Sequence, residues 1–138
     1  MPRVYRVMKR SDGKPALGAT ATTLGVRSSI DIAPDASGDV HPNNGGMSVS
    51  PSLRALPMFR VPRRLQALVP GAAGSNSHAV WRMGEGPFVA GVIAERLQFR
   101  PDPQNSSHGF IEPSDRMSLT EYELALHATQ DDWLIDEE

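Results

Sequence analysis

Four residues in strand-like stretches carry side chains that can do chemistry: Arg6, Ser48, His108 and Glu112. Ser48 lies in Gly45–Pro51, where two glycines precede alternating apolar and polar residues, a pattern typical of a short strand entered through a turn. On such a strand Ser48 shares one face with Ser50. The two hydroxyls can therefore line a cleft, or they can belong to an ordinary exposed strand.

Arg6 lies in a first predicted strand, Arg3–Met8, which ends before the turn Ser11–Gly13. On this strand its side chain shares a face with the apolar Val4 and Met8. An arginine with apolar neighbours either extends to solvent or points into a cleft. In the second case its planar guanidinium suits a phosphate or a carboxylate, which it can bind through two hydrogen bonds.

Several familiar catalytic and binding motifs are absent. The sequence has no phosphate-binding glycine-rich loop followed by lysine, no His-Glu-x-x-His helix and no Gly-x-Ser-x-Gly elbow. It has no cysteine, which excludes disulfides and thiolate chemistry. The histidines are too scattered along the chain for a metal site, so no metal is expected: His41, His78, His108 and His127.

The elements that must position the candidate residues are mostly short strands. Further strands are predicted at Ala79–Met83, Val89–Ile93, Leu97–Arg100 and His108–Pro113. A capping box, Ser118–Glu121, predicts a final helix whose apolar face runs over about 16 residues to Trp133. We therefore expect one α+β domain over residues 1–138, with a mostly antiparallel, split β-sheet, long loops and a C-terminal α-helix.

Composition and charge limit the classes of function. No apolar run approaches the roughly 18 residues of a membrane span, and the N-terminus lacks the apolar core of a secretory signal. We expect a cytoplasmic protein without a membrane partner. The acid-free segment that holds Arg54, Arg60, Arg63 and Arg64 suggests phosphate or nucleic acid. Its single aromatic residue and the net charge of −2 favour a solvated surface, so no nucleic acid is expected.

Residues 14–46 show little periodicity and several turn signals. A long irregular stretch inside a compact domain is usually a functional loop or disordered. This one can cover a site or lie against a partner.

The order of the short motifs resembles that of small NAD-dependent ADP-ribosyltransferase toxins. More narrowly, it resembles the cytotoxic effectors of the type VI secretion system that share that fold. The matching pieces are Val4–Val7, Gly45–Val49, and His108–Pro113 followed by Met117. Those effectors carry a Tyr-Arg strand near the start, a Gly-Gly-x-Ser-Val segment mid-chain and a histidine strand before a proline and a methionine. The resemblance implies an ADP-ribosyltransferase-like fold with NAD as a substrate.

The resemblance also implies roles for individual residues. Arg6 would face a phosphate or ribose of NAD, Ser48 would line the nicotinamide pocket, and His108 would approach the ribose. Glu112 would stabilise the positive charge that develops on the ribose as nicotinamide leaves. Phe110 stands where the first acid of a Glu-x-Glu pattern would be, which counts against arginine as the acceptor. The residues implied in NAD binding are Tyr5, Arg6, Gly46, Ser48 and Ser50.

Two classes of function follow from these observations. The first is a bacterial cytotoxic effector, an ADP-ribosyltransferase or NAD glycohydrolase that acts in the cytoplasm of a neighbouring cell and reaches it without a signal peptide. It implies an unknown cytosolic target and a cognate immunity protein. The second is a non-catalytic binding protein, such as an immunity or antitoxin partner, or an adaptor that uses its acidic tail, Asp131–Glu138. In either case we expect a cleft where the first strand, the Ser48 strand and the His108 strand converge.

Overall fold

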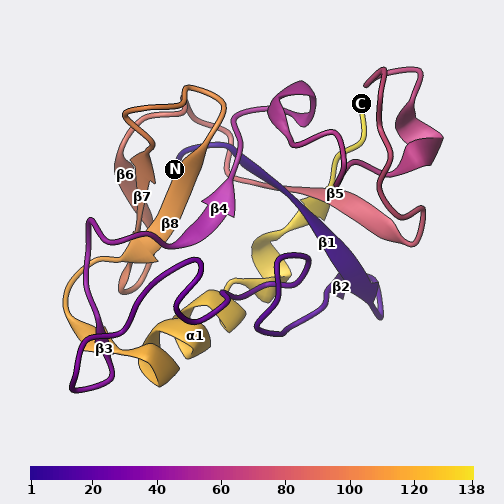
Figure 1. Cartoon of the computed structure of the whole chain (residues 1–138). Coiled ribbons are helices and arrows are strands. Elements are labelled where there is room, and N and C mark those ends of the chain that lie inside the picture. The colour runs from indigo at the N-terminus through magenta and orange to yellow at the C-terminus, as the bar shows by residue number, and fades with distance from the viewer.

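The structure, a computed structural model, describes all residues from 1 to 138 (Figure 1). Its strands are β1 (Val4–Ser11), β2 (Lys14–Pro15), β3 (Asp39–Val40), β4 (Met47–Val49), β5 (His78–Met83), β6 (Gly91–Ala94), β7 (Leu97–Pro101), β8 (Gly109–Pro113), β9 (Met117–Ser118) and β10 (Leu134–Ile135). The single α-helix is α1 (Leu119–His127), and three short 3₁₀ turns lie at Leu53–Ala55, Arg63–Leu65 and Gln130–Asp132. All strand pairs within the sheets are antiparallel. The predicted α+β class, with antiparallel sheets and one helix near the C-terminus, is confirmed.

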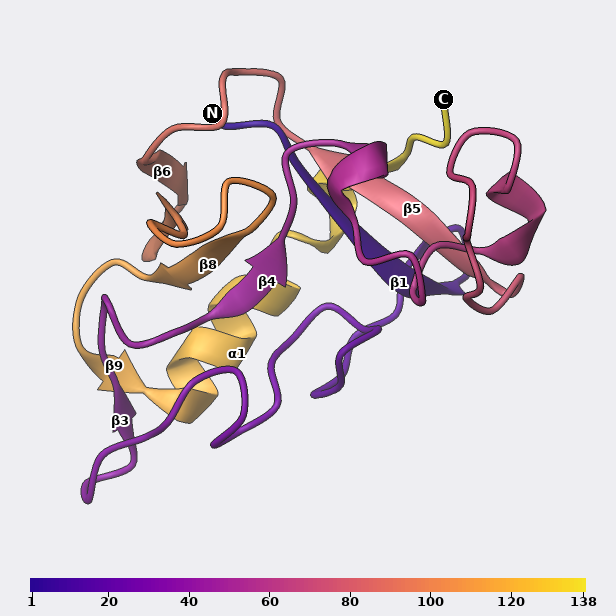
Figure 2. The same ribbon diagram turned by 45° about the horizontal axis from the view of Figure 1, so that its top comes forward.

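The sheet is split into two four-stranded parts, with strand orders β10-β5-β1-β2 and β4-β8-β7-β6, and a small β3-β9 pair. The two large parts meet where β1 begins. There the backbones of Tyr5 and Ser50 exchange two hydrogen bonds, with N–O distances of 2.8 and 2.9 Å. Figure 2 shows β4 between β8 and β1. The N-terminal strand therefore lies next to the Ser48 strand. The Ser48 strand in turn pairs with the strand that follows His108.

Alternation along β1 gives this strand an apolar core on each of its faces. Val4 and Met8 point into a main core of 19 buried residues, which also holds Trp81 of the paired strand β5. Tyr5 and Val7 point the other way, into a second core of eight buried residues supplied largely by the segment 53–72. Both faces of the first part of β1, Val4–Met8, are therefore covered, and the side chains of these residues are held in place, whereas the last three residues of the strand are exposed.

Helix α1 packs beneath the main core and fixes β4 against β8 (Figure 1). The buried hydroxyl of Tyr122 accepts a hydrogen bond from the Met47 N–H and donates one to the Ile111 carbonyl. Burial raises the pKa of this hydroxyl far above its ordinary value, so it keeps its proton. The helix is thus a support for the Ser48 strand.

The predicted capping box is present, because Ser118 Oγ accepts from the Glu121 N–H and Glu121 Oε1 accepts from the Ser118 N–H. The predicted length of the helix was wrong. It ends at His127, where the Thr129 hydroxyl donates to the Leu126 carbonyl and the chain turns into a 3₁₀ segment. Trp133 is still buried in the main core, but it reaches the core from beyond the helix.

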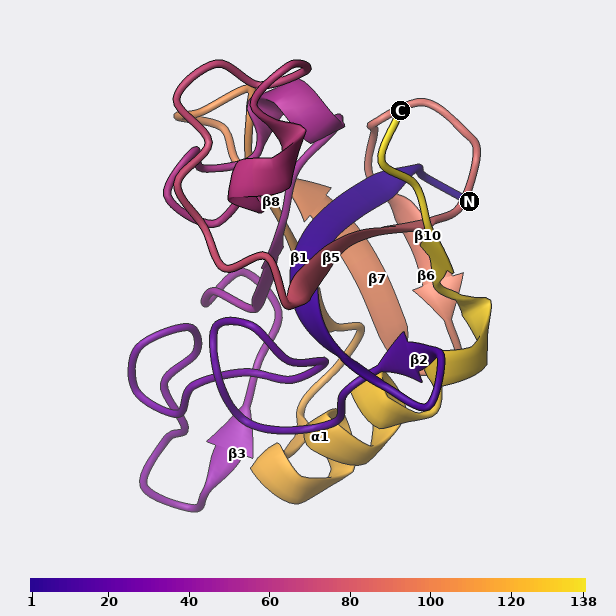
Figure 3. The ribbon, with the colours of Figure 1, turned by 90° about the vertical axis from the view of Figure 1, so that its right-hand side faces the viewer.

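The acidic tail is part of the fold, because β10 adds to the outer edge of β5 (Figure 3). Asp136 Oδ2 accepts hydrogen bonds from the Tyr5 hydroxyl at 3.0 Å and from Arg82 Nε at 2.9 Å. Glu137 accepts two hydrogen bonds from Arg64. The tail is thus ordered by contacts within its own chain. No helix in the structure is both long enough and apolar enough to span a membrane.

Candidate functional site

A cleft of about 390 Å³ opens where β1, β4 and the loop before β8 converge. That volume lies within the range of about 300–1,000 Å³ typical of small-molecule sites. Four of the residues implicated by the sequence line it: Arg6, Ser48, Ser50 and His108. Arg6, Ser48 and Ser50 lie close together because Tyr5 of β1 pairs with Ser50, the residue that follows β4. His108 lies nearby because β4 pairs with β8, the strand that follows His108.

Arg6 forms the floor of the cleft and is only 6% exposed. Its guanidinium donates to the Ser48 carbonyl at 2.8 Å and to the carbonyls of Thr20, Thr23 and Gly25 at 3.0–3.3 Å. It therefore ties β4 and the loop 20–25 to β1. No carboxylate lies within ion-pairing distance of it, and one of its Nη1 hydrogens has no protein acceptor. Burial lowers the pKa of Arg6 to about 10, so the group is still charged at neutral pH.

The two serines of the β4 segment present hydroxyls beside this charge. Ser48 is half-buried, and its hydroxyl has no hydrogen-bond partner in the protein, although its carbonyl is held by Arg6. Ser50 is buried, and its backbone carries the link to β1. Both hydroxyls can bind a polar group of a ligand in the cleft.

His108 closes the opposite side of the cleft at the end of a compact loop, residues 102–108. Its ring Nδ1 lies 3.0 Å from Asp102 Oδ2. Its ring also packs edge-on against Phe110, with 4.6 Å between centroids. Nε2 makes no hydrogen bond within the protein. The histidine is thus held by one ring nitrogen and leaves the other for a ligand.

The remaining charged lining residues make the cleft cationic. Arg27 binds both carboxylate oxygens of Asp31, the only acid that lines the cleft, at 3.0 and 3.2 Å. Arg60 has no carboxylate partner, and its guanidinium carbon lies 4.8 Å from the ring centre of its neighbour Phe59. Phe59 lines the cleft and is 64% exposed, so its ring can stack on a flat group of a ligand. The arrangement favours an anionic ligand that carries an aromatic ring.

Glu112 lies outside the cleft although it is only four residues from His108 along the chain. It is fully buried, and its carboxylate accepts from the Asn43 N–H at 2.8 Å, Gln98 Nε2 at 2.7 Å and Arg100 Nε at 3.0 Å. All of its contacts are structural, because they join the loop before β4 to β7 and β8. In this conformation Glu112 cannot reach a ligand held between Arg6 and His108.

Tyr5 and Gly46 also lie outside the cleft. Tyr5 points to the opposite face of β1 from Arg6, into the second core, where its hydroxyl donates to Asp136. Gly46 has a φ of +143°, and a Cβ there would lie 2.7 Å from the Ile111 carbonyl oxygen. Glycine is therefore needed for β4 to approach β8, and the residue shapes the cleft indirectly.

Sequence reasoning did not assign Arg27, Asp31 or Phe59 to the site, and it placed Arg60 on a solvated surface. Arg27 and Asp31 come from the irregular stretch 14–46, which folds against β1 and contributes one wall of the cleft. The acid-free segment around Arg60 was the one signal that could have indicated an anion site.

No three His, Asp or Glu side chains lie close enough together to hold a metal ion. Comparison of the chain with protein-family models, with curated proteins and with solved structures found no match.

Proposed function

We propose that the cleft binds NAD and that the protein breaks the bond between nicotinamide and ribose, with transfer of ADP-ribose to a target molecule or to water. Following the resemblance of its motifs, we further propose an ADP-ribosyltransferase-like cytotoxic effector of the type VI class. Such an effector would act in the cytoplasm of a target cell and be neutralised by a cognate immunity protein.

One observation carries the enzymatic part of the proposal. Arg6 and Arg60 line the same cleft, and neither has a carboxylate partner. A buried cation without an ion-pair partner costs stability, and a ligand that brings a negative charge to Arg6 would offset part of that cost. A pyrophosphate supplies that negative charge, and arginine binds it well because its N–H groups match the spacing of phosphate oxygens.

Each lining residue has a role in this proposal. Arg60 and the free N–H of Arg6 bind the pyrophosphate. Phe59 stacks on a ring of the dinucleotide, and the Ser48 hydroxyl forms a hydrogen bond with the nicotinamide carboxamide. His108 lies beside the ribose. Asp31 is the only carboxylate available to the positive charge that develops on the ribose, and Arg27 already neutralises it in part. Glu112 has no direct role, because its oxygens are occupied elsewhere.

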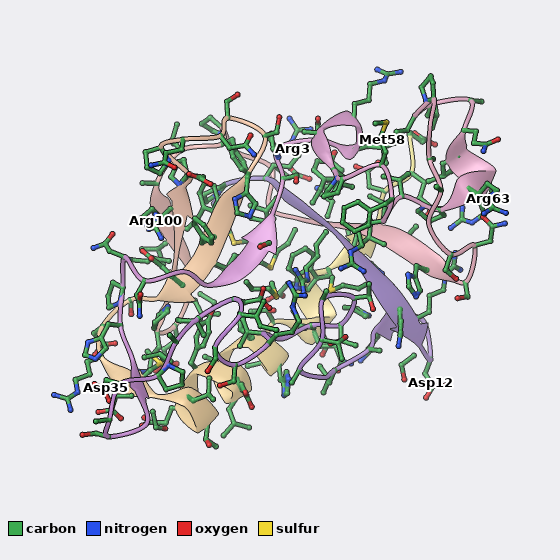
Figure 4. The ribbon with its side chains drawn as sticks, in the orientation of Figure 1. Arg3, Asp12, Asp35, Met58, Arg63 and Arg100 are labelled. Carbon is green, nitrogen blue, oxygen red and sulfur yellow. The ribbon has the colours of Figure 1, made fainter.

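The test is nicotinamide release from NAD by the purified protein, with and without a bacterial lysate that supplies possible targets. His108→Ala and Arg60→Ala should each reduce release at least about tenfold, since each removes a ligand contact worth about 1.4 kcal/mol or more. Arg63→Ala is the matched control, because Arg63 belongs to the same segment as Arg60 but points outward and does not line the cleft (Figure 4). No release by the wild-type protein would overturn the proposal.

The cytotoxic part has its own test. Expression of the wild-type chain in an unprotected bacterium should stop growth, and expression of His108→Ala should not. Unchanged growth with the wild-type chain would contradict the effector proposal, whatever the chemistry in the cleft.

A second function, a binding protein for an anionic ligand without catalysis, is favoured by the pairing of Asp31 with Arg27, because it leaves no free carboxylate in the cleft. In that case NAD or pyrophosphate would raise the melting temperature of the protein, but no nicotinamide would be released. The acidic tail is a poor candidate for an adaptor arm, since β10 and Asp136 are bound to β5 and Tyr5.

A further inference from the structure

The loop that carries His108 is built around a carboxylate. Asp102 Oδ1 accepts from the Gln104 N–H at 2.9 Å, and its other oxygen faces His108 Nδ1 at 3.0 Å. The Asp102 N–H donates to the His108 carbonyl, and the His108 N–H donates to the Asn105 carbonyl. The two residues are thus fixed to each other through both backbone and side chain.

This contact determines which ring nitrogen of His108 carries the proton. The hydrogen bond with His108 lowers the pKa of Asp102 below its ordinary value, so the carboxylate is ionised at neutral pH and can only accept. Nδ1 must then be the donor. In the neutral ring Nε2 is left with a lone pair, on the side of the ring that has no protein partner.

The ring is also fixed in orientation. Phe110 packs edge-on against it, and Arg100 lies over the ring of Phe110 at 4.6 Å. Arg100 in turn binds the buried Glu112. The Glu112 carboxylate therefore supports, through two intervening side chains, the platform on which His108 rests.

We infer that Asp102 is a positioning residue that presents His108 Nε2 to the cleft as a general base, so that the ADP-ribose acceptor is an oxygen nucleophile, a hydroxyl group or water. This inference rests on the proposed function. The acceptor gives its proton to Nε2 as its oxygen bonds to C1′ of the ribose. The C1′–N bond breaks, its electron pair leaves with nicotinamide and neutralises the pyridinium charge, and His108 then releases the proton to solvent.

A guanidinium acceptor is disfavoured by the same surroundings. It would bring a positive charge into a cleft that already holds Arg6, Arg27 and Arg60. Asp31, the only carboxylate there, is bound at both oxygens by Arg27. A neutral hydroxyl or water meets no such repulsion and needs only a base.

The molecule contains its own control. His41 and Asp35 form a second histidine–carboxylate pair near β3, and neither residue lines the cleft. Asp35 is labelled in Figure 4. Here the carboxylate faces Nε2, at 2.7 Å, so the proton should lie on Nε2 and the lone pair on Nδ1. The two histidines should therefore be opposite tautomers.

The first experiment measures the ¹⁵N chemical shifts of the ring nitrogens in the protein without substrate, at a pH where both rings are neutral. His108 should show a protonated Nδ1 and an unprotonated Nε2, and His41 the reverse. Asp102→Asn should remove this preference at His108 alone, and Asp102→Glu should restore it at least in part. A wild-type His108 with its proton on Nε2 would overturn the inference.

The second experiment measures catalysis. Asp102→Asn should lower the kcat of nicotinamide release at least about tenfold and change the KM for NAD less than about twofold, because Asp102 does not line the cleft. Asp35→Asn should change neither. A kcat for Asp102→Asn within twofold of the wild type would overturn the positioning role.

The products identify the acceptor. With methanol added, a hydroxyl-accepting site should form methyl-ADP-ribose beside free ADP-ribose, and a strictly hydrolytic site free ADP-ribose only. Transfer to agmatine, which carries a guanidinium, would overturn the acceptor assignment. A wild-type protein that releases no nicotinamide would overturn the proposed function and the acceptor with it, whereas the ring tautomer separately decides whether Asp102 positions His108.

Discussion

Arg6 and Glu112 are the two charged side chains that the fold buries, and they are buried in opposite ways. Glu112 is enclosed by an arginine, a glutamine and a backbone N–H, which together neutralise it and use both of its oxygens. Arg6 donates hydrogen bonds only to backbone carbonyls and forms no ion pair, and it faces a cleft. A buried charge whose partners are all within the protein is structural, whereas one without a counter-ion beside an open cleft is suited to a ligand.

The largest expected effect concerns the stability that Arg6 supplies. Arg6→Ala removes the hydrogen bonds to four backbone carbonyls that lie on β4 and in the loop 20–25. Leaving several of these groups unpaired should cost about 3–5 kcal/mol in the free energy of unfolding, a large part of the stability of a small domain. Urea denaturation measures this.

The control for Arg6→Ala is Arg116→Ala, which breaks an exposed ion pair with Asp39 and should cost about 1 kcal/mol or less. If Arg6→Ala cost no more than this control, Arg6 would be a ligand-binding residue only. Because a loss of fold is expected, Arg6→Ala is not a suitable variant for testing ligand binding in the cleft.

Glu112→Gln should destabilise the protein by about 2–4 kcal/mol, because it leaves Arg100 partly buried without its carboxylate. A double-mutant cycle with Arg100→Met should recover part of this cost, since the second substitution removes the unpaired cation. The folded fraction of Glu112→Gln should release nicotinamide within about threefold of the wild-type rate. A loss of more than about a hundredfold would instead make Glu112 a catalytic residue.

The contrast between these two charges shows what the sequence could and could not predict. Alternation of side chains along β1 put Arg6 and Tyr5 on opposite faces, yet both were predicted to bind NAD, and only Arg6 lines the cleft. The resemblance of the motifs gave Glu112 a role at the ribose. It could not show that Gln98, Arg100 and the Asn43 N–H would enclose Glu112, because two of these partners come from another strand and one from a loop 69 residues away.

The strands also differ in how well the sequence predicted them. Those with alternating residues between turn signals, such as β1, β4 and β8, were located from the sequence to within a few residues. Three of the four two-residue strands, β3, β9 and β10, were not predicted, because they exist only through pairing with distant partners and leave no local pattern. The cleft depends on both kinds of information: its strand residues were predicted, and the stretch 14–46 was recognised as one that can cover a site, but its lining residues Arg27 and Asp31 were not identified.

A smaller effect should come from adding an anion. Pyrophosphate at about ten times its Kd should stabilise the wild-type protein by about 1.4 kcal/mol and raise its melting temperature by about 4–6 °C. Arg60→Ala should weaken this shift, and added salt should reduce it in the wild type. Glu112→Gln, although destabilised, should keep the shift, because its charge does not face the cleft. The same shift in Arg60→Ala as in the wild type would indicate that the anion binds elsewhere.

The smallest effect concerns the carboxylates of the tail, which resemble Glu112 in having partners within the protein. Burial alone would raise the pKa of Asp136, but hydrogen bonds from Tyr5, the Glu138 N–H and Arg82 lower it below its ordinary value of 3.8. Burial also raises the pKa of Glu137. Hydrogen bonds from Arg64 and the Val80 N–H outweigh this effect, so the pKa of Glu137 falls below its ordinary value of 4.5.

For both groups the unfolded chain takes up protons at a higher pH than the folded one does. Their contribution to stability is therefore complete above pH 4.5 and is lost as the pH falls through the lowered pKa values. Because each pair is partly solvated, the loss should be about 1 kcal/mol or less per group. Urea denaturation between pH 6 and about pH 3 measures how the free energy of unfolding falls with pH. The fall should be smaller for the double variant Asp136→Asn with Glu137→Gln than for Glu95→Gln, which alters an exposed acid without a partner. Identical pH dependence in the two variants would mean that backbone pairing alone holds β10 on β5. The partners of Asp136 and Glu137 would then not stabilise the fold, in contrast to the partners of Glu112.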